Sequence, residues 1–180
     1  DKQGRAALIL AAQNGRDKAV KLLMRHEGGV SGWTSLIYSA YFGYVDAVRD
    51  NLHKKACKDI TGRTALMWAA HRGHTECVKP LLKWEARMQD EYEWTALIHA
   101  ACEGKVDCIR LLLDKEAGMQ GAKKQTALMK AAKSGHLECV KLLLEKEARM
   151  TDIHGCTALV YAARAGHREI TELLVDHEKD

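Results

Sequence analysis

A short segment that recurs roughly every 31 residues is the feature that most restricts how this chain can fold. Thr-Ala-Leu stands at residues 64–66, 95–97, 126–128 and 157–159, and degenerate copies stand at 6–8 and 34–36. The leucines are 28, 30, 31, 31 and 31 residues apart, and a glycine follows seven residues after each of them. Six copies in register predict a repeat protein in which each repeat packs on its neighbours.

Each copy has the pattern of two short helices. The threonine is a good N-cap, because its hydroxyl can accept a hydrogen bond from an unpaired backbone N–H of the first turn. The glycine fits the left-handed position that ends a helix. A second helix follows, with apolar residues at helical spacing such as Val140, Leu143 and Leu144. Because helices this short are marginal alone, each must bury its apolar face against the next repeat. We therefore predict an all-α solenoid of helix-turn-helix units.

The pattern resembles the ankyrin repeat, and the resemblance covers the whole chain. The closest copy runs from Asp152 and Gly155 through residues 157–159 and 162–163 to Gly166-His167. The resemblance implies six stacked helix-turn-helix repeats with short projecting β-turn loops and a concave binding face. In this single array the predicted repeats span residues 1–31, 32–58, 59–89, 90–120, 121–151 and 152–180.

Two irregularities interrupt the array. The 28-residue step lacks three residues before Gly32, so the loop tip is either deleted or missing from the numbered chain. Pro80 falls inside the predicted second helix of the third repeat, where an unrelieved proline costs about 3 kcal/mol. This proline is either tolerated decay in a redundant array or a functional kink.

The residues with reactive side chains are explained by the repeat. Cys77, Cys108 and Cys139 recur at one repeat position, and packed helices lie about 8–10 Å apart, whereas a disulfide needs Cα atoms within roughly 7 Å. Histidines such as His136 follow the helix-ending glycine, where local hydrogen bonding is expected. The sequence has no phosphate-binding loop, catalytic triad pattern or zinc spacing. We therefore expect no enzyme activity, cofactor or metal, and a reducing, cytoplasmic location.

Charge and hydropathy restrict the partners. The net charge of +4 is too small and dispersed to indicate nucleic acid, and no apolar run approaches the roughly 18 residues that cross a bilayer. We expect a monomer that contacts neither nucleic acid nor membrane. Because the chain opens inside the repeat pattern, we also expect more repeats or a covering segment before Asp1.

The resemblance also implies where a protein partner would bind. Ankyrin repeats contact partners through the loop tips, the residue before the capping threonine and the two residues before the helix-ending glycine. With adjoining first-helix positions, the predicted partner-binding residues are Trp33, Tyr41, Phe42, Arg63, Trp68, His71, Arg72, Tyr92, Trp94, Glu103, Lys123, Lys130, Lys133 and Arg164. Aromatic residues and arginine dominate interface energies. We therefore predict an aromatic and arginine hot spot, flanked by lysines that meet an acidic partner segment. The alternative is that Trp33 and Trp94 only cover neighbouring turns.

Three functions compete at this stage. The leading one is a protein–protein interaction scaffold or adaptor. A second is a regulatory module of a larger NEK-like kinase, because loop sequences such as residues 144–150 look like the ankyrin arrays of diplomonad protozoa, some of which are joined to NEK-type kinases. The third is phosphate or nucleic-acid binding by the basic surface of the fifth repeat, which the small net charge disfavours.

Overall fold

The computed structural model describes residues 7–178 and is all-helical over them, which confirms the predicted fold class. The first helices of the pairs are α1 (Ala7–Gln13), α3 (Ser35–Phe42), α5 (Ala65–Arg72), α7 (Ala96–Cys102), α9 (Ala127–Ser134) and α11 (Ala158–Ala165). The second helices are α2 (Asp17–Ser31), α4 (Val45–Asp50), α6 (Thr75–Glu85), α8 (Val106–Glu116), α10 (Leu137–Glu147) and α12 (Arg168–Glu178). Two 3-10 turns, η1 (Leu52–Lys54) and η2 (Ala122–Lys124), lie in the connections. The outer ends of the first and sixth predicted repeats, residues 1–6 and 179–180, lie outside the described part.

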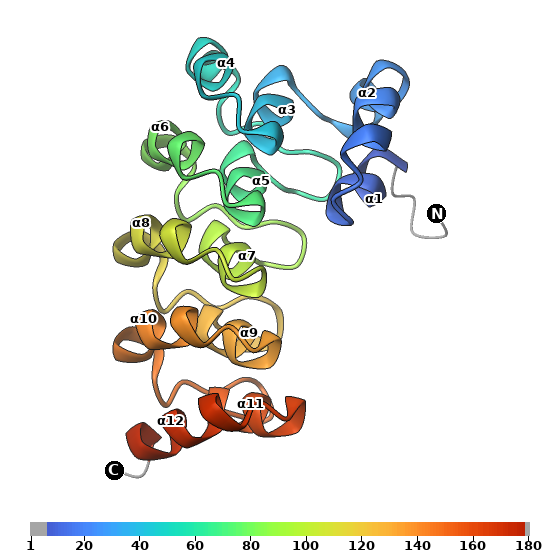
Figure 1. The fold of residues 1–180 in the computed structure, drawn as a ribbon. Coiled ribbons are helices and arrows are strands. Elements are labelled where there is room, and N and C mark those ends of the chain that lie inside the picture. The colour runs from blue at the N-terminus through green and yellow to red at the C-terminus, as the bar shows by residue number, and fades with distance from the viewer. Residues whose placement is uncertain (1–6, 179–180) are drawn as a thin grey trace.

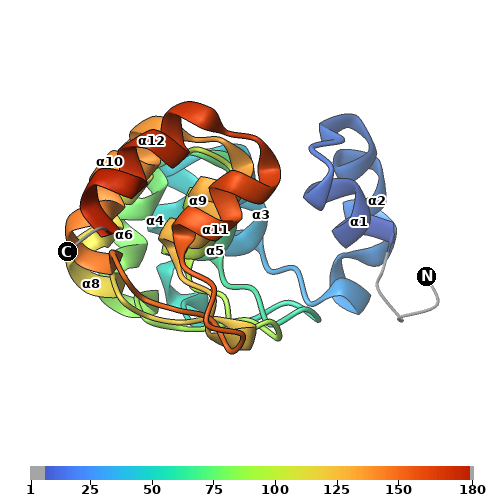
Figure 2. The same cartoon turned by 90° about the horizontal axis from the view of Figure 1, so that it is seen from below.

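Repeats two to six stack in two rows of helices. The inner row runs α3, α5, α7, α9 and α11, and the outer row runs α4, α6, α8, α10 and α12, each helix packing on the next in its row (Figure 1). The loops that join the repeats gather along one edge of the stack (Figure 2). The buried core lies between the rows, where the alanine pairs of the inner helices and residues such as Leu97 and Ile109 are inaccessible to solvent.

The predicted threonine caps are present in repeats two to five. The Thr64, Thr95 and Thr126 hydroxyls accept hydrogen bonds of 3.3–3.4 Å from backbone N–H groups three residues ahead. The glycine at the end of the first helix has positive φ in every repeat, as at Gly73, where φ is 84°. A side chain there would be strained, so the glycine both ends the first helix and sets the direction of the second.

A buried glutamate at the end of the second helix joins neighbouring repeats, and the sequence did not reveal it. In α8, Glu116 Oε2 accepts a hydrogen bond from Leu97 N (2.7 Å), at the start of its own repeat, and Oε1 accepts one from Arg87 N (2.9 Å) in the preceding connection. Glu85 and Glu147 make the same pair of bonds in repeats three and five. Burial raises the pKa of all three carboxyl groups, and the hydrogen bonds oppose that rise.

The first repeat is offset from the stack that the other five repeats form. α1 packs on α2 but does not pack along α3 as α3 packs along α5, and the α1–α2 pair lies beside the array (Figure 1). The cause is the shortened connection before Gly32. In place of a loop, α2 continues to Ser31, whose carbonyl accepts the hydrogen bond from Ile60 N (3.0 Å) that a loop tip would otherwise take.

Candidate partner-binding face

The concave face is formed by the inner helices and the loops, and an aspartate organises most of the loops. Asp59 Oδ1 accepts hydrogen bonds from Thr61 N (2.8 Å) and Arg63 N (3.0 Å), and its Oδ2 accepts one from Trp68 Nε1 (2.8 Å) on α5. His99 and Tyr161 contact Asp90 and Asp152 in the same way, at 2.8 and 2.7 Å. The first-helix position that the sequence assigned to partner contact therefore anchors the loop in these three repeats.

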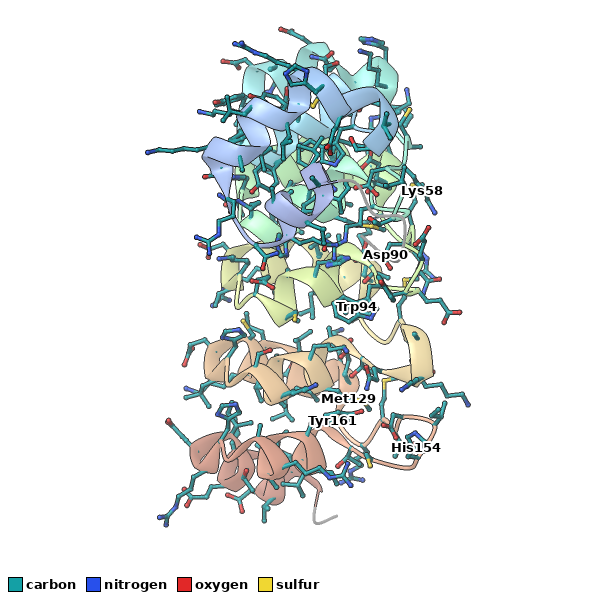
Figure 3. The ribbon with its side chains drawn as sticks, turned by 90° about the vertical axis from the view of Figure 1, so that its right-hand side faces the viewer. Lys58, Asp90, Trp94, Met129, His154 and Tyr161 are labelled. Carbon is teal, nitrogen blue, oxygen red and sulfur yellow. The ribbon has the colours of Figure 1, made fainter. Side chains whose placement is uncertain are left out.

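Repeat one covers the half of this face that α3 and α5 form. The Tyr41 hydroxyl lies 3.3 Å from the Ala12 carbonyl and 3.0 Å from the Asp17 carboxylate, and it is the donor to each. The rings of Trp33, Tyr41 and Trp68 pack together with centroids 5.3–5.7 Å apart. Tyr41 and Trp68 are fully buried and Trp33 is 4% exposed. Figure 3 shows the α1–α2 pair lying over this half of the face.

Arg63 is buried at the edge of the same aromatic cluster. Its guanidinium lies over the Trp68 ring (4.7 Å), and its Nε is 3.6 Å from Asp90 Oδ2. Its Nε and Nη1 have no hydrogen-bond partner, and the same is true of Trp33 Nε1. Burial lowers the pKa of Arg63, and the carboxylates of Asp90 and Asp59 oppose this shift. Because its donors are enclosed, Arg63 acts within the loop layer in this arrangement.

The half of the face formed by repeats four to six is uncovered. Trp94 lies there (Figure 3), and the Lys130 ammonium is 4.3 Å from its ring centroid. Repeat five has Gly121 in place of the loop aspartate, so Lys130 Nζ instead donates to Gln125 Oε1 (2.6 Å). Tyr92 is 47% exposed and its ring centroid is 6.4 Å from that of Trp94. This half therefore presents aromatic and cationic side chains together.

The predicted partner-binding residues divide into three groups by burial. Four are buried in this arrangement: Trp33, Tyr41, Arg63 and Trp68. Five are partly buried: Phe42, His71, Arg72, Trp94 and Lys130. Five are exposed: Tyr92, Glu103, Lys123, Lys133 and Arg164. For Trp33 the structure favours the alternative of a packing role, because its buried ring packs against those of Tyr41 and Trp68.

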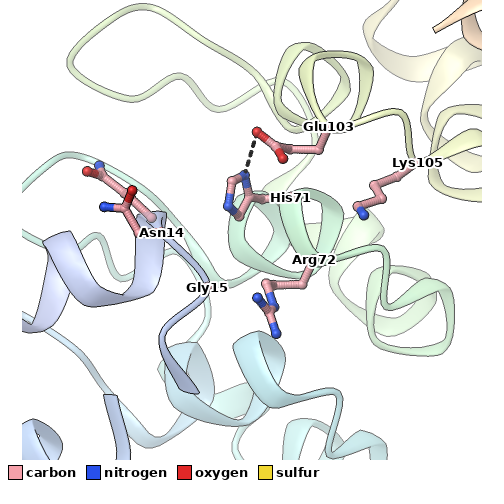
Figure 4. A pocket seen from close by; sticks show the side chains of 7 residues that line it. Asn14, Gly15, His71, Arg72, Glu103 and Lys105 are labelled. Atoms are coloured by element: carbon pink, nitrogen blue, oxygen red, sulfur yellow. Dashed lines mark ion pairs between the residues drawn. The ribbon is translucent and has the colours of Figure 1, made fainter. Parts of the chain in front are cut away.

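A polar cavity of about 480 Å³ separates repeat one from the third and fourth repeats (Figure 4). Its lining residues are Gln13, Asn14, Gly15, His71, Arg72, Glu103 and Lys105. Burial, with Arg63 and other nearby cations, lowers the pKa of His71 to about 3. His71 is therefore neutral at neutral pH, and its 3.7 Å approach to Glu103 is a polar contact between a neutral ring and a carboxylate.

The cysteines and other potential ligands form no reactive site in the described part of the chain. All six cysteines are free thiols, and burial raises the pKa of Cys77 and Cys139 to about 11 and that of Cys108 to about 12. Such thiols are poor nucleophiles, because only the thiolate reacts readily. Residues 7–178 contain no group of three or more His, Cys, Asp or Glu side chains arranged to hold a metal ion. None of the described helices is long and apolar enough to span a bilayer.

The fold and this face define a class: a helical repeat protein whose repeated residues form the scaffold and whose varied residues line a concave side. The sequence profile of the family described as ankyrin repeats (3 copies) matches residues 1–50, 50–120 and 114–180. The chain therefore belongs to the ankyrin-repeat family. Ankyrin repeats are generally protein-binding modules, and their all-helical fold is typically not catalytic. A search of the curated proteins found no match.

Proposed function

We propose that this chain is a protein-interaction scaffold that binds a partner on the uncovered half of its concave face and the adjoining loop tips. The observation that carries the proposal is the position of Trp94. This large aromatic side chain stays partly exposed on the open half, beside Tyr92 and under the Lys130 ammonium. Tryptophan, tyrosine and arginine are the residues that most often dominate interface energies.

The charge of the open half favours an acidic partner segment. Repeats five and six, which follow the repeat of Trp94 and Tyr92 in the stack, carry the exposed cations Lys123, Lys133 and Arg164. Burial lowers the pKa of Lys130, because it disfavours the charged ammonium. A carboxylate of the partner near Lys130 would offset this cost by stabilising the positive charge. Complementary charge of this kind increases specificity and association rate.

Capture of partners from cell lysate with matched tryptophan variants tests the proposal. Trp94→Ala removes the central aromatic residue. Trp84→Ala is the control, because Trp84 is also a surface tryptophan (43% exposed) beneath lysine ammoniums but lies on the outer-row helix α6. Mass spectrometry identifies the bound proteins, and circular dichroism confirms that both variants are folded.

The expected result is that Trp84→Ala and the unchanged chain retain the same partner. Trp94→Ala should weaken the affinity by about 30-fold, the equivalent of the ~2 kcal/mol loss typical of a hot-spot residue. If the folded Trp94→Ala variant keeps its affinity, the partner does not bind on the open half of the face and the proposal is wrong.

Two other functions remain as alternatives with their own tests. The loop sequence of residues 144–150, which resembles diplomonad ankyrin arrays, supports a regulatory module of a NEK-type kinase with catalysis outside this chain. Reading the gene on both sides of this segment would reveal an adjoining kinase domain. The lysines of the fifth repeat suggest phosphate or nucleic-acid binding. That activity would lose affinity steeply as salt rises, whereas binding centred on Trp94 would respond weakly.

We further propose that the chain acts as a monomer in a reducing compartment such as the cytoplasm. Support comes from its six unpaired cysteines, of which Cys57 is exposed and would be open to oxidation elsewhere. Sedimentation analysis with and without reductant measures the oligomeric state, and a dimer that persists in reductant would contradict the proposal.

A further inference from the structure

A carboxylate already occupies the covered half of the concave face. Arg72 Nη2, on α5, lies 3.1 Å from both Oδ1 and Oδ2 of Asp17, in the first turn of α2. The Tyr41 hydroxyl donates a third hydrogen bond to Oδ1 (3.0 Å), and the Arg72 guanidinium lies over the Tyr41 ring (4.7 Å). Asp17 is 55 residues from Arg72 in the sequence, so this contact joins repeat one to repeat three.

Apolar packing holds the described part of repeat one in this position, because Leu8, Ile9, Ala12 and Val20 belong to the same buried core cluster as Tyr41 and Trp68. α1 does not pack along α3, and the peptide after Ser31 is the only covalent link between repeat one and the stack. The remaining links include the Ile60–Ser31 backbone bond, the Tyr41–Ala12 bond and the Lys21 ammonium 5.1 Å from the Phe42 ring. Among residues 7–178, Asp17–Arg72 is the ion pair that crosses this junction.

The pair is also accessible enough for another carboxylate to compete. The Asp17 side chain is 46% exposed and that of Arg72 is 25% exposed. Ion pairs with this exposure contribute little net stability, because solvent screens them and both side chains lose freedom. Exchanging the Asp17 carboxylate for one from another molecule would therefore cost little in the ion pair itself, and the partner must cover the apolar surface that repeat one uncovers as it moves.

We propose that Arg72 and Tyr41 form a carboxylate-binding site on the concave face, and that Asp17 of repeat one fills it in place of an acidic side chain of the partner. When the partner's carboxylate takes this position, repeat one swings out about Gly32 and the Tyr41 ring becomes part of the interface. This inference rests on the proposed protein-binding function and adds a second contact region and the acidic chemistry recognised there.

The cavity beside Arg72 provides room for the rest of such a ligand. Its volume of about 480 Å³ exceeds that of a single carboxylate, and Lys105 adds a second cation to its wall. The neutral His71 ring can donate or accept one hydrogen bond there. Gly15 approaches so closely that a Cβ atom would lie 3.1 Å from Arg72 Nη1, so repeat one sits directly against the proposed site.

The test uses a hexaglutamate peptide as the probe and two variants with matched charge. Asp17→Ser removes the occupying carboxylate. Asp46→Ser removes the same charge from the first turn of α4, where Asp46 pairs with Arg49 outside the concave face. Serine is well tolerated at a helix start, so both variants should fold. Isothermal titration calorimetry at low salt measures the peptide affinity of each.

Asp17→Ser should bind the peptide about fivefold or more tightly than the unchanged chain, because the site no longer has to be vacated first. Asp46→Ser should match the unchanged chain, and adding Arg72→Ala to Asp17→Ser should abolish the gain. Hydrogen exchange should also accelerate at α1 and α3 in Asp17→Ser. An Asp17→Ser affinity within twofold of the unchanged chain, or an equal gain in Asp46→Ser, would overturn the proposal.

The outcome is separable from that of the proposed function. The tryptophan variants test the open half of the face with the captured partner, whereas the peptide titration tests the covered half with a defined probe. Loss of partner capture in Trp94→Ala would support the proposed scaffold function. Unchanged peptide affinity in Asp17→Ser would at the same time contradict the proposed carboxylate site at Arg72.

Discussion

At the scale of single residues, the buried glutamates show how a charged side chain can stabilise a repeat array. Glu116 is 1% exposed, and burying its charge is compensated by backbone N–H donors from two repeats. A hydrogen bond from a neutral donor to an ionised acceptor is stronger than one between neutral groups. The carboxylate therefore connects two repeats and is not available to a partner on the concave face.

Glu116→Gln should destabilise the chain by about 1–3 kcal/mol, because the amide can accept at one oxygen only and leaves a buried N–H group without an acceptor. The free energy of unfolding in urea measures the change. Glu138→Gln is the matched control, because Glu138 lies on the exposed side of α10 and pairs with Lys141 in solvent. Equal stability of the two variants would show that the buried carboxylate does not connect the repeats.

His71 gives the array a predictable response to acid. Its folded-state pKa of about 3 lies below the ordinary value of 6.5, so below about pH 6.5 the unfolded chain binds a proton that the folded chain does not. The stability contributed by the neutral ring is present above pH 6.5 and is lost as the pH falls toward 3.

Replacing the ring isolates this contribution. Between about pH 6.5 and 4.5 the unchanged chain should lose on the order of 2 kcal/mol more stability than His71→Gln. Urea unfolding of both proteins across this range measures the difference, in which the other titrating groups, including His99 with its pKa lowered to about 4, cancel. Parallel stability curves would show that His71 is not held neutral by its surroundings.

At the scale of elements, Pro80 does not end the helix that contains it. α6 has 11 residues, as α8 and α10 do, although Pro80 cannot donate a backbone hydrogen bond to the preceding turn. The corresponding residues of the next three repeats are leucines, which pack partly buried against the core. The proline therefore lacks a helix hydrogen bond that its counterparts have and presents a smaller side chain at the same partly buried position.

Pro80→Leu should stabilise the chain by up to about 3 kcal/mol, since it restores the helix bond that proline cannot donate. Thermal and urea unfolding measure the gain. Partner binding distinguishes the two roles considered for the proline. A stabilised variant that binds as before would indicate tolerated decay, and a stabilised variant that binds less would indicate a functional kink. A variant of unchanged or lower stability would contradict the prediction.

The sequence predicted the elements better than it predicted their arrangement at the amino end. The capping threonines and helix-ending glycines act locally, so their pattern located the helices of every repeat. The path of α2 depends instead on a tertiary contact, because the Ser31 carbonyl at its end accepts the hydrogen bond from Ile60 N. A local sequence pattern does not predict such a contact. The candidate site was affected in the same way, because repeat one buries Tyr41, which the repeat pattern had placed on an open face.

At the scale of the whole molecule, stability should follow the connections between neighbours, and these are unequal along the array. Repeat two has only a six-residue second helix, α4, where α6, α8 and α10 each have 11 residues. Lys55 stands at the position of the buried glutamate, so the connection that Glu85 and Glu116 provide is missing there. Repeat one, in turn, is held outside the stack.

In a one-dimensional array the segment with the weakest neighbour contacts opens first. Native-state hydrogen exchange should therefore be at least about tenfold faster in α1 to α4 than in α7 to α10, equivalent to the ~1.4 kcal/mol or more that a missing buried hydrogen bond costs. Mass spectrometry of peptides from each repeat measures the profile. The Glu116→Gln variant adds an internal check, because it should extend fast exchange into α7 and α8 while leaving α11 and α12 unchanged. Uniform exchange along the chain would show that the array opens as one unit and that the glutamate connections do not set its local stability.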